Sequence, residues 1–328
     1  MTDFANASIP EPRVAAVVVT YNRKALLRQC LEALQNQTHP VADIIVVDNA
    51  STDGTAAMVR ADFPDVTLRV LDENRGGAGG FHEGMKEAVT QDVEWIWVMD
   101  DDAEPAPDAL EALCGTDVHR APDTVALTPL KRFPSGRPQY DQTGWYDPVH
   151  AEIEAVTAAD EDCTEISYGA FVGLLCRVDA VQRVGLPAAD FFLWYDDVEF
   201  CLRLARQGNI FLIRESRITH HVSEDRRSQE EGEAKPWRYF ELSYYWRYYY
   251  GYRNRLLILR RHVPSVTHRM RGYARVLFFV LRSAGSVLLY SSRKWGKLQI
   301  LFWGILDGLM GRAGKRVDPE RYLDASSG

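Results

Sequence analysis

Short apolar runs alternate with amphipathic stretches along the first hundred residues. Runs at 14–19, 44–47 and 68–71 have the length of β-strands, and the first two are rich in the β-branched residues typical of strands covered on both faces. Leucines at helical spacing over 26–34 predict a helix, and a second helix is expected at 55–62. This alternation with short links predicts a parallel sheet with helices on both faces.

The next part of the chain continues the pattern and then becomes less regular. A glycine-rich segment at 74–80 leads to a helix expected at 82–90, and an apolar strand follows at 95–99. Residues 103–165 favour loops and edge strands. A helix is expected at 196–207, closed by Gly208, and short strands are expected at 210–213 and 217–219.

The last hundred residues differ in character. Residues 223–236 are almost wholly polar and predict a mobile loop; 237–261 and 269–310 favour helices. The most apolar window, 276–290, contains Arg282 and is expected to be too short and too charged to span a bilayer. The predicted organisation is a tail at 1–12, an α/β domain at 13–222, the loop at 223–236, a helical region at 237–316 and a tail at 317–328.

Charge is distributed unevenly along the 328 residues. Residues 235–317 hold 17 Lys and Arg but only Glu241 and Asp307, a net charge of +15, so the remainder of this −8 chain carries −23. A basic, apolar region indicates first a membrane surface and second a nucleic-acid patch; a helical cap or dimer interface is the plainer alternative. Five scattered cysteines without a CxxC pair and a polar start without an apolar leader favour a cytoplasmic protein.

Three aspartates, Asp100 to Asp102, directly follow the strand at 95–99. In extended backbone, Asp100 and Asp102 converge and Asp101 points away. Two convergent carboxylates favour a hard divalent cation, Mg²⁺ or Mn²⁺, which usually also binds substrate phosphates. A solvated acidic turn is the alternative.

Polar residues at neighbouring strand ends indicate a nucleotide site beside the triplet. Thr20, Arg23, Asp48 and Asn74 should stand at one sheet edge, where Asp48 can accept hydrogen bonds from a base or ribose and Arg23 can pair with phosphate. Asp48 as a simple turn residue is the alternative. The glycines around Gly77 do not match a dinucleotide fingerprint; they favour close backbone approach to a sugar or phosphate over a flexible linker.

A second chemical centre lies at 191–200, where aromatic residues precede Asp196, Asp197 and Glu199. Asp196 and Glu199 fit a capping pair, which leaves Asp197 at the first helical position as a candidate general base for a sugar hydroxyl. Pure capping by both aspartates is the alternative. His220 and His221 end a strand further on, and one of them could supply a nitrogen ligand to the cation.

Four segments, 17–23, 45–54, 99–102 and 195–203, together resemble the family 2 inverting glycosyltransferases of GT-A fold. Within that family, the segment 74–81, the Trp-Tyr-Asp-Asp element, His220 and the Tyr-Arg-Asn-Arg run at 252–255 look most like bacterial galactofuranosyltransferases. The resemblance implies an α/β fold, UDP-galactofuranose as donor and a polyprenyl-pyrophosphate-linked acceptor.

The resemblance also implies roles for individual residues. The nucleotide-sugar would be held by Thr20, Arg23, Asp48, Asn74, Gly77 and Asp100, with Trp194 and Tyr195 stacking on sugar faces. Mn²⁺ or Mg²⁺ would be bound by Asp100, Asp102 and His220, and Asp197, beside Asp196, would be the catalytic base. The enzyme would be cytoplasmic and peripheral to the inner face of the membrane, and a homo-oligomer is a further expectation. A dTDP-rhamnose-dependent transferase and a non-catalytic nucleotide-sugar or nucleic-acid module are the other readings.

Overall fold

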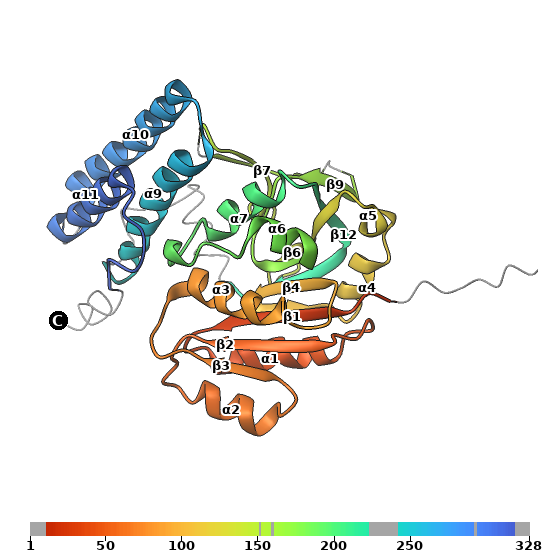
Figure 1. Cartoon of the computed structure of the whole chain (residues 1–328). Helices are drawn as coiled ribbons and strands as arrows, with labels where there is room; N and C mark the ends of the chain where they lie inside the picture. Colours follow the sequence, from red (N-terminus) through yellow and green to blue (C-terminus); the bar gives the residue numbers. More distant parts are fainter. Residues whose placement is uncertain (1–10, 151, 159–160, 223–241, 292–293, 319–328) are drawn as a thin grey trace, which may run out of the picture.

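The computed structural model describes residues 11–150, 152–158, 161–222, 242–291 and 294–318. The expected loop at 223–236 and most of both expected tails lie outside these ranges. Within them the chain forms a large mixed sheet, a small second sheet and a group of C-terminal helices (Figure 1).

The large sheet has the strand order β3-β2-β1-β4-β11-β6-β12-β5 among the described residues, with β9 paired to β12. Strands β1 to β4 are mutually parallel, whereas β11 runs antiparallel to both of its neighbours. The strands of this sheet are β1 Val14–Thr20, β2 Asp43–Asp48, β3 Thr67–Val70, β4 Trp95–Asp100, β5 Ala103–Pro105, β6 Thr124–Arg132, β9 Cys163–Ile166, β11 Val172–Arg177 and β12 Asn209–His220. The expected α/β fold is therefore confirmed, with an antiparallel part in the irregular middle of the chain.

A smaller sheet and short helices complete this part of the molecule. The small sheet has the order β10-β7-β8, with β7 Thr143–Asp147, β8 Glu152–Ala155 and β10 Tyr168–Gly169. The helices are α1 Lys24–Gln35, α2 Thr55–Asp62, α3 Gly76–Ala88, α4 Ala109–Cys114, α5 Asp117–Arg120, α6 Val178–Val184 and α7 Asp196–Leu204, with a 3₁₀ turn η1 at Ala189–Phe191.

The glycine segment was expected to precede a helix that begins at residue 82. It instead forms the first turns of that helix. Helix α3 begins at Gly76 and packs closely on the sheet. A Cβ at Gly80 would lie only 2.4 Å from Val19, and one at Gly84 only 2.4 Å from Val17, so this approach requires glycine at both positions. Gly80 in this segment and Gly84 beyond it therefore serve helix–sheet packing, whereas Gly76 lies against the Phe192 carbonyl. Helix α7 also ends earlier than expected, at Leu204, and the two strands expected at 210–219 are one strand, β12, with a register shift.

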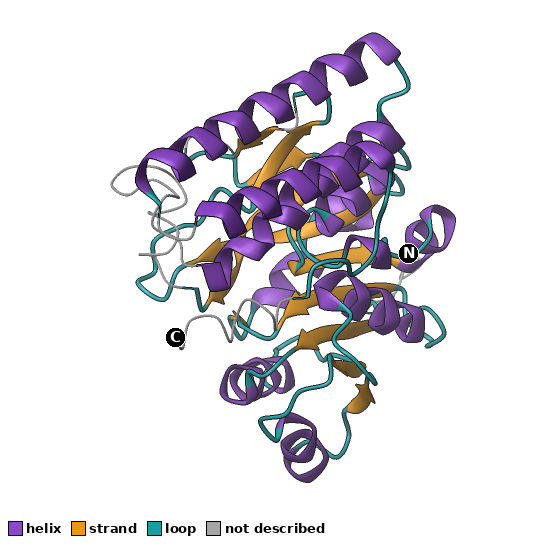
Figure 2. Ribbon diagram, turned by 90° about the vertical axis from the view of Figure 1, so that its left-hand side faces the viewer, coloured by secondary structure: helices purple, strands orange, loops and turns teal. Residues whose placement is uncertain are grey.

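Three C-terminal helices, α9 Leu242–His262, α10 Val266–Tyr290 and α11 Lys294–Met310, stand beside the sheet domain (Figures 1 and 2). The second helical stretch expected from the sequence is thus two helices. By length and composition alone, α10 could cross a membrane over Val266–Leu289. The apolar window 276–290, expected to be too short and too charged to span a bilayer, is thus the centre of a longer helix that qualifies by length and composition alone.

Candidate active site

A cavity of about 690 Å³ opens at the carboxyl ends of β1 and β4. The register places Thr20 beside Asp48 and Val19 beside Asp100, so these strand ends do meet at one edge. The predicted residues that line the cavity are Thr20, Arg23, Asn74, Gly77, Asp100, Asp102, Trp194, Tyr195, Asp196, Asp197 and His220. Among the predicted site residues, Asp48 is the one that does not line it.

The acidic triplet is arranged differently from the alternation expected of a strand. Strand β4 ends at Asp100, and the chain turns at Asp101 and Asp102. Asp101 does not point away: its carboxylate accepts hydrogen bonds from the Thr20 hydroxyl at 2.7 Å and from Arg23 at 3.1 Å. Arg23 also donates to Asp102 at 2.6 Å. One guanidinium therefore joins two of the three carboxylates.

The triplet concentrates negative charge in a partly dry site. Burial, followed by repulsion from Asp102 and Asp101, raises the pKa of Asp100 well above its usual range. Burial likewise raises the pKa of Asp101 to about 6. Burial opposes ionisation of Asp102 as well, but His220 and Arg23 outweigh it and lower the pKa of that carboxyl. Three acidic side chains facing one arginine do not all ionise readily, so a further cation would stabilise the ionised form of Asp100.

His220 and His221 have different partners. His220 is buried, and its Nε2 lies 3.3 Å from Asp102 Oδ1 while its Nδ1 lies 3.0 Å from Gln139 Oε1. His221 instead pairs with Glu104 at 2.5 Å. His220 is therefore the histidine that faces the triplet.

The fit of these residues to a divalent cation is partial. No three His, Cys, Asp or Glu side chains within the described ranges converge closely enough to hold an ion as they stand. However, Asp102 Oδ1 is buried without a hydrogen-bond partner and faces His220. One or two carboxylates with substrate phosphates and waters are a usual set for Mg²⁺. Asp102 and His220, with Asp100 nearby, thus fit part of a shell that a diphosphate would complete.

Asp48 lies at the end of β2, and the glycine segment begins helix α3. Asp48 is fully buried, and its Oδ1 accepts from the Ser51 amide at 2.9 Å, the turn role that was the alternative reading. Its Oδ2 has no hydrogen-bond partner among the described residues. Asn74 accepts from the Gly76 amide at 2.8 Å. Gly77 lines the cavity, and a Cβ there would meet nothing closer than Phe81 at 4.0 Å.

Asp196 and Asp197 open helix α7, but Asp196 is not the N-cap residue that was expected to pair with Glu199. The residue before the helix is Tyr195, with a left-handed backbone, so Asp196 is the first helical residue and Asp197 the second. The capping prediction is wrong because the backbone reverses at Trp194 and Tyr195 (φ 63° and 68°), which local sequence does not reveal. Asp197 Oδ2 accepts a hydrogen bond from the Tyr168 hydroxyl at 3.1 Å.

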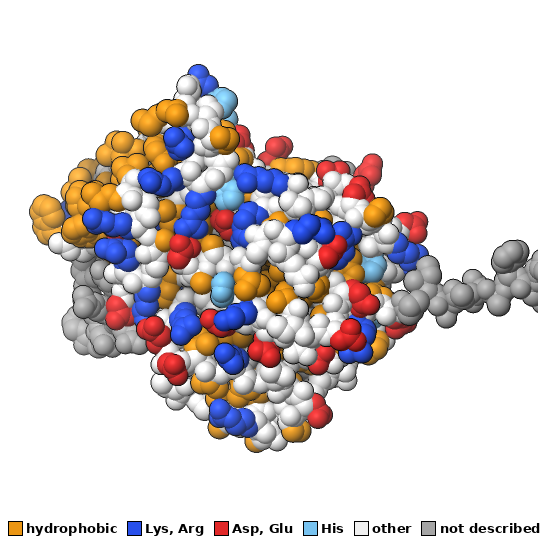
Figure 3. All heavy atoms as spheres, in the orientation of Figure 1, with side chains coloured by type: hydrophobic (Ala, Val, Ile, Leu, Met, Phe, Trp, Pro, Cys, Tyr) orange, Lys and Arg blue, Asp and Glu red, His pale blue; other side chains and the backbone are white. Residues whose placement is uncertain are grey.

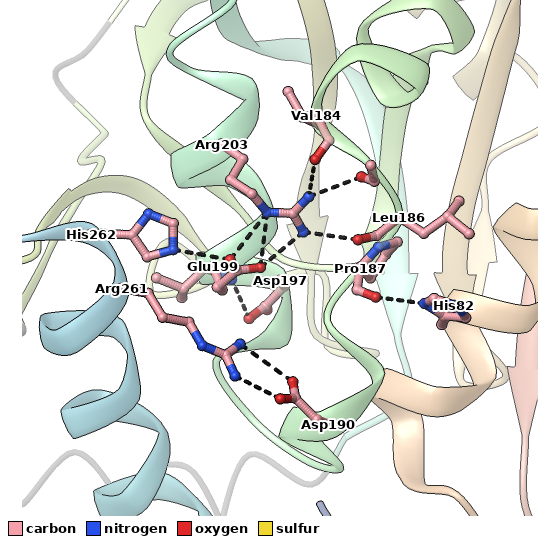
Figure 4. Close-up of polar contacts among 12 residues, drawn as sticks. His82, Val184, Leu186, Pro187, Asp190, Asp197, Glu199, Arg203, Arg261 and His262 are labelled. Atoms are coloured by element: carbon pink, nitrogen blue, oxygen red, sulfur yellow. Dashed lines mark hydrogen bonds and ion pairs between the residues drawn. The ribbon is translucent and has the colours of Figure 1, made fainter. Parts of the chain in front are cut away.

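Glu199 does not cap helix α7; its side chain binds Arg203 and His262 (Figure 4). Its carboxylate accepts a bidentate pair of hydrogen bonds from Arg203 and one at 2.9 Å from His262 Nε2. Arg203 also donates to the carbonyls of Val184, Gly185 and Leu186. Helix α7, which carries Asp197, is thus tied to the end of α6 and to the end of α9.

The carboxyls at the start of α7 titrate unusually. Burial, then repulsion from Asp197, raises the pKa of Asp196, and burial raises the pKa of Asp197 to about 6. Hydrogen bonds to Asp197 from the Val198 amide and Tyr168 oppose the effect of burial. Asp197 is therefore ionised at neutral pH and able to accept a proton.

Sequence reasoning missed several residues of this site. Tyr168 is one of them, and Lys131 is another: it is fully buried, donates to the hydroxyls of Thr128 and Thr143, and has its pKa lowered to about 7 by burial. A lone lysine in the apolar run 124–132 was the available signal. Trp246 and Arg247 of α9 also line the cavity, so the C-terminal helices contribute to it.

Comparison with known proteins identifies the family of the chain. The family model "Glycosyl transferase family 2" matches residues 15–185. Galactofuranosyltransferase GlfT1 of Mycolicibacterium smegmatis is 31% identical over 204 residues, 60% of this chain and 66% of that protein; its Mycobacterium tuberculosis counterpart is 30% identical, with 65% covered. The chain thus spans slightly less than two thirds of these relatives. The N-acetylglucosaminyl-diphospho-decaprenol L-rhamnosyltransferase of Mycobacterium tuberculosis is 25% identical over 230 residues, 62% of this chain and 75% of that protein.

Solved structures share the fold at low sequence identity. The mannosyltransferase PcManGT of Pyrobaculum calidifontis, in complex with GDP-Man and Mn²⁺, has a TM-score of 0.53 at 17% identity, covering 92% of this chain and 88% of that one. TarS 1–349 of S. aureus in complex with UDP has a TM-score of 0.56 at 16% identity, covering 92% and 82%. The GT-A fold expected from the sequence is confirmed, and the chain belongs to glycosyl transferase family 2.

Proposed function

We propose that this family 2 glycosyltransferase transfers galactofuranose from UDP-galactofuranose, with inversion, to a lipid-linked glycan acceptor in cell-envelope polysaccharide synthesis. The observation that carries the proposal is the meeting, in one cavity, of the acidic triplet after β4 and the carboxylates at the start of α7. Similarity to the galactofuranosyltransferases supports the donor.

The residues divide the work between the two substrates. Thr20, Arg23, Asn74 and Gly77 surround the nucleotide-sugar, and the unpartnered Oδ2 of Asp48 offers an acceptor to the base or ribose. Trp194 and Tyr195 present aromatic faces to the sugars. Asp102 and His220, with Asp100, would hold Mn²⁺ or Mg²⁺, which supplies positive charge to the diphosphate of the leaving group.

Asp197 performs the proton transfer. Its carboxylate takes the proton of the acceptor hydroxyl as that oxygen attacks the anomeric carbon. The bond from this carbon to the diphosphate breaks on the opposite face, and UDP leaves with the bonding electrons. Asp196 lies beside Asp197, where its carboxyl is held protonated by burial, so it adds little repulsion to the ionised base.

The C-terminal helices support a site of action at the cytoplasmic face of a membrane. Large apolar side chains of α10 and α11 are exposed, among them Phe278, Leu281, Leu289 and Trp295 at 62–79%. Figure 3 shows hydrophobic side chains gathered over these helices, with Lys and Arg side chains between them and the rest of the molecule. An apolar face bordered by basic residues matches an anionic bilayer that carries a lipid-linked acceptor. The same face could join copies of the chain.

A donor panel tests the proposal. UDP-galactofuranose, dTDP-rhamnose and UDP-glucose are offered with Mn²⁺ and a polyprenyl-pyrophosphate-linked acceptor. Galactofuranosyl transfer that is lost in Asp197→Asn and Asp102→Asn, both of them folded, is the expected result. Transfer from dTDP-rhamnose alone would establish the rhamnosyltransferase, a second candidate favoured by the similar rhamnosyltransferase. Nucleotide binding without transfer from any donor would contradict an enzyme.

A further inference from the structure

The segment between η1 and α7 has a backbone that its own sequence does not favour. Phe192, Trp194 and Tyr195 have φ values of 66°, 63° and 68°, in the left-handed region that bulky side chains rarely adopt. This conformation directs Trp194 and Tyr195 to the cavity and decides where α7 begins. Such strained positions persist only where surrounding contacts impose them.

Asn254 of α9 supplies the most direct of these contacts. Its side-chain amide nitrogen lies 3.0 Å from the Phe191 carbonyl oxygen, 2.9 Å from that of Leu193 and 2.7 Å from that of Trp194. Both residues that flank Leu193 are among the left-handed ones. One fully buried side chain, from a helix about 60 residues away, therefore shares its two N–H groups among three carbonyls at 191–194.

Arg253 fixes Asn254 and extends the contact. Its Nε donates to Asn254 Oδ1 at 2.9 Å, which orients the amide so that the nitrogen faces the segment. Its Nη2 donates to the carbonyls of Phe191 and Asp190, and its Nη1 to that of Gly314. Arg253 is fully buried and pairs with no carboxylate among the described residues. A buried cation whose bonds go to backbone carbonyls serves to hold that backbone.

Two further contacts hold the segment from other directions. Arg255 donates to the Tyr195 hydroxyl, and its guanidinium lies 5.1 Å from the centre of that ring. On the α3 side, the Ala78 amide donates to the Phe192 carbonyl at 3.3 Å, and a Cβ at Gly76 would lie 1.9 Å from the same oxygen. The segment is therefore enclosed between α9 and the start of α3.

We propose that Arg253 and Asn254 are positioning residues. They impose the positive φ angles within 192–195 and so place Trp194, Tyr195 and Asp197 for the acceptor. Helix α9 is then part of the active site rather than an attachment to it. This inference rests on the proposed role of Asp197. A role confined to joining the two parts of the molecule would lower stability without affecting the acceptor step selectively.

Asn254→Asp is the sharpest perturbation. It keeps the volume and the oxygen that faces Arg253, gives Arg253 a counter-ion, and removes the donors to the three carbonyls. Asn254→Ala is the second variant. Ser283→Ala is the matched control, because it removes a 2.7 Å contact between α10 and Tyr252 of the same helix α9 and leaves the segment untouched.

Three measurements decide the matter: amide hydrogen exchange of the peptide 189–198, UDP affinity by calorimetry, and kcat for transfer. In both Asn254 variants we expect faster exchange in this peptide and a kcat lowered about 10- to 100-fold, since small misplacement of reacting groups is costly, with UDP affinity within about twofold. Ser283→Ala should change none of them.

Unchanged exchange in 189–198 in a folded Asn254 variant would overturn the inference, as would UDP affinity that falls in step with kcat. Hydrogen exchange needs no substrate, so it tests the positioning role separately from the proposed function. If the unaltered enzyme transfers no sugar, the proposed function fails while the exchange result still decides whether α9 holds the segment.

Discussion

Tyr168→Phe is expected to shift the pH dependence of transfer rather than abolish it. Tyr168 is buried on β10, and its hydroxyl donates to Asp197 Oδ2 at 3.1 Å. The substitution removes this one donor and keeps the ring. A hydrogen bond to an ionised group is worth about 1.5–3 kcal/mol, and 1.36 kcal/mol corresponds to about one pKa unit. The pKa of Asp197, about 6 in the intact site, should therefore rise by about one to two units.

The size of the effect follows from the fraction of ionised base. With a pKa of about 6, roughly nine tenths of Asp197 is ionised at about pH 7; with a pKa of about 7 to 8, roughly a half to a tenth remains. The variant should therefore lose about two- to tenfold of kcat/KM at neutral pH and regain most of it near pH 9. Because Asp196 and Asp197 are neighbours, the acid limb reports the pair.

The assay is kcat/KM for transfer, measured from about pH 5.5 to 9.5. Tyr146→Phe is the matched control, because Tyr146 is equally buried but its hydroxyl has no hydrogen-bond partner among the described residues. Its profile should overlay that of the unaltered enzyme. A Tyr168→Phe profile lowered by the same factor at every pH would refute the argument that the hydroxyl acts through the ionisation of Asp197.

Three further changes have definite expected outcomes. Lys131→Met removes a buried amine whose protonated form favours ionisation of Asp197, so the acid limb should move to higher pH. Lys297→Met, at a buried lysine of α11, should leave the pH profile unmoved. Gly76→Ala places a Cβ against the Phe192 carbonyl at a φ of +72° and should lower the free energy of unfolding by about 1–3 kcal/mol in urea titration, while Gly285→Ala meets open space and should not destabilise. Leu289→Glu, at an exposed apolar position of α10, should weaken co-sedimentation with anionic liposomes, and unchanged binding would argue against docking by this face.

Much of the sheet domain was predictable because its signals are local. An apolar run of β-branched residues forms β1, and the strand that precedes the aspartates is β4, which is buried along almost its whole length. Because parallel strands end at the same edge of a sheet, Thr20 and Asp100 meet there whatever path the chain takes between the strands. The composition of this edge could therefore be read from residues adjacent in sequence.

The geometry of the site depended on contacts that no local pattern records. Asp101 faces Thr20 and Arg23 because the chain turns directly after β4, so strand alternation no longer applies. Asp197 occupies the second helical position because Asn254, far along the chain, holds the preceding residues in a left-handed backbone. Strand and helix propensities are short-range energies, whereas the burial of a lysine at 131 or the pairing of 168 with 197 arises only when distant segments share one dry interior. The amino-acid sequence thus determined which chemical groups reach the sheet edge, and the tertiary structure decided their orientation, their charge and the helix that holds them.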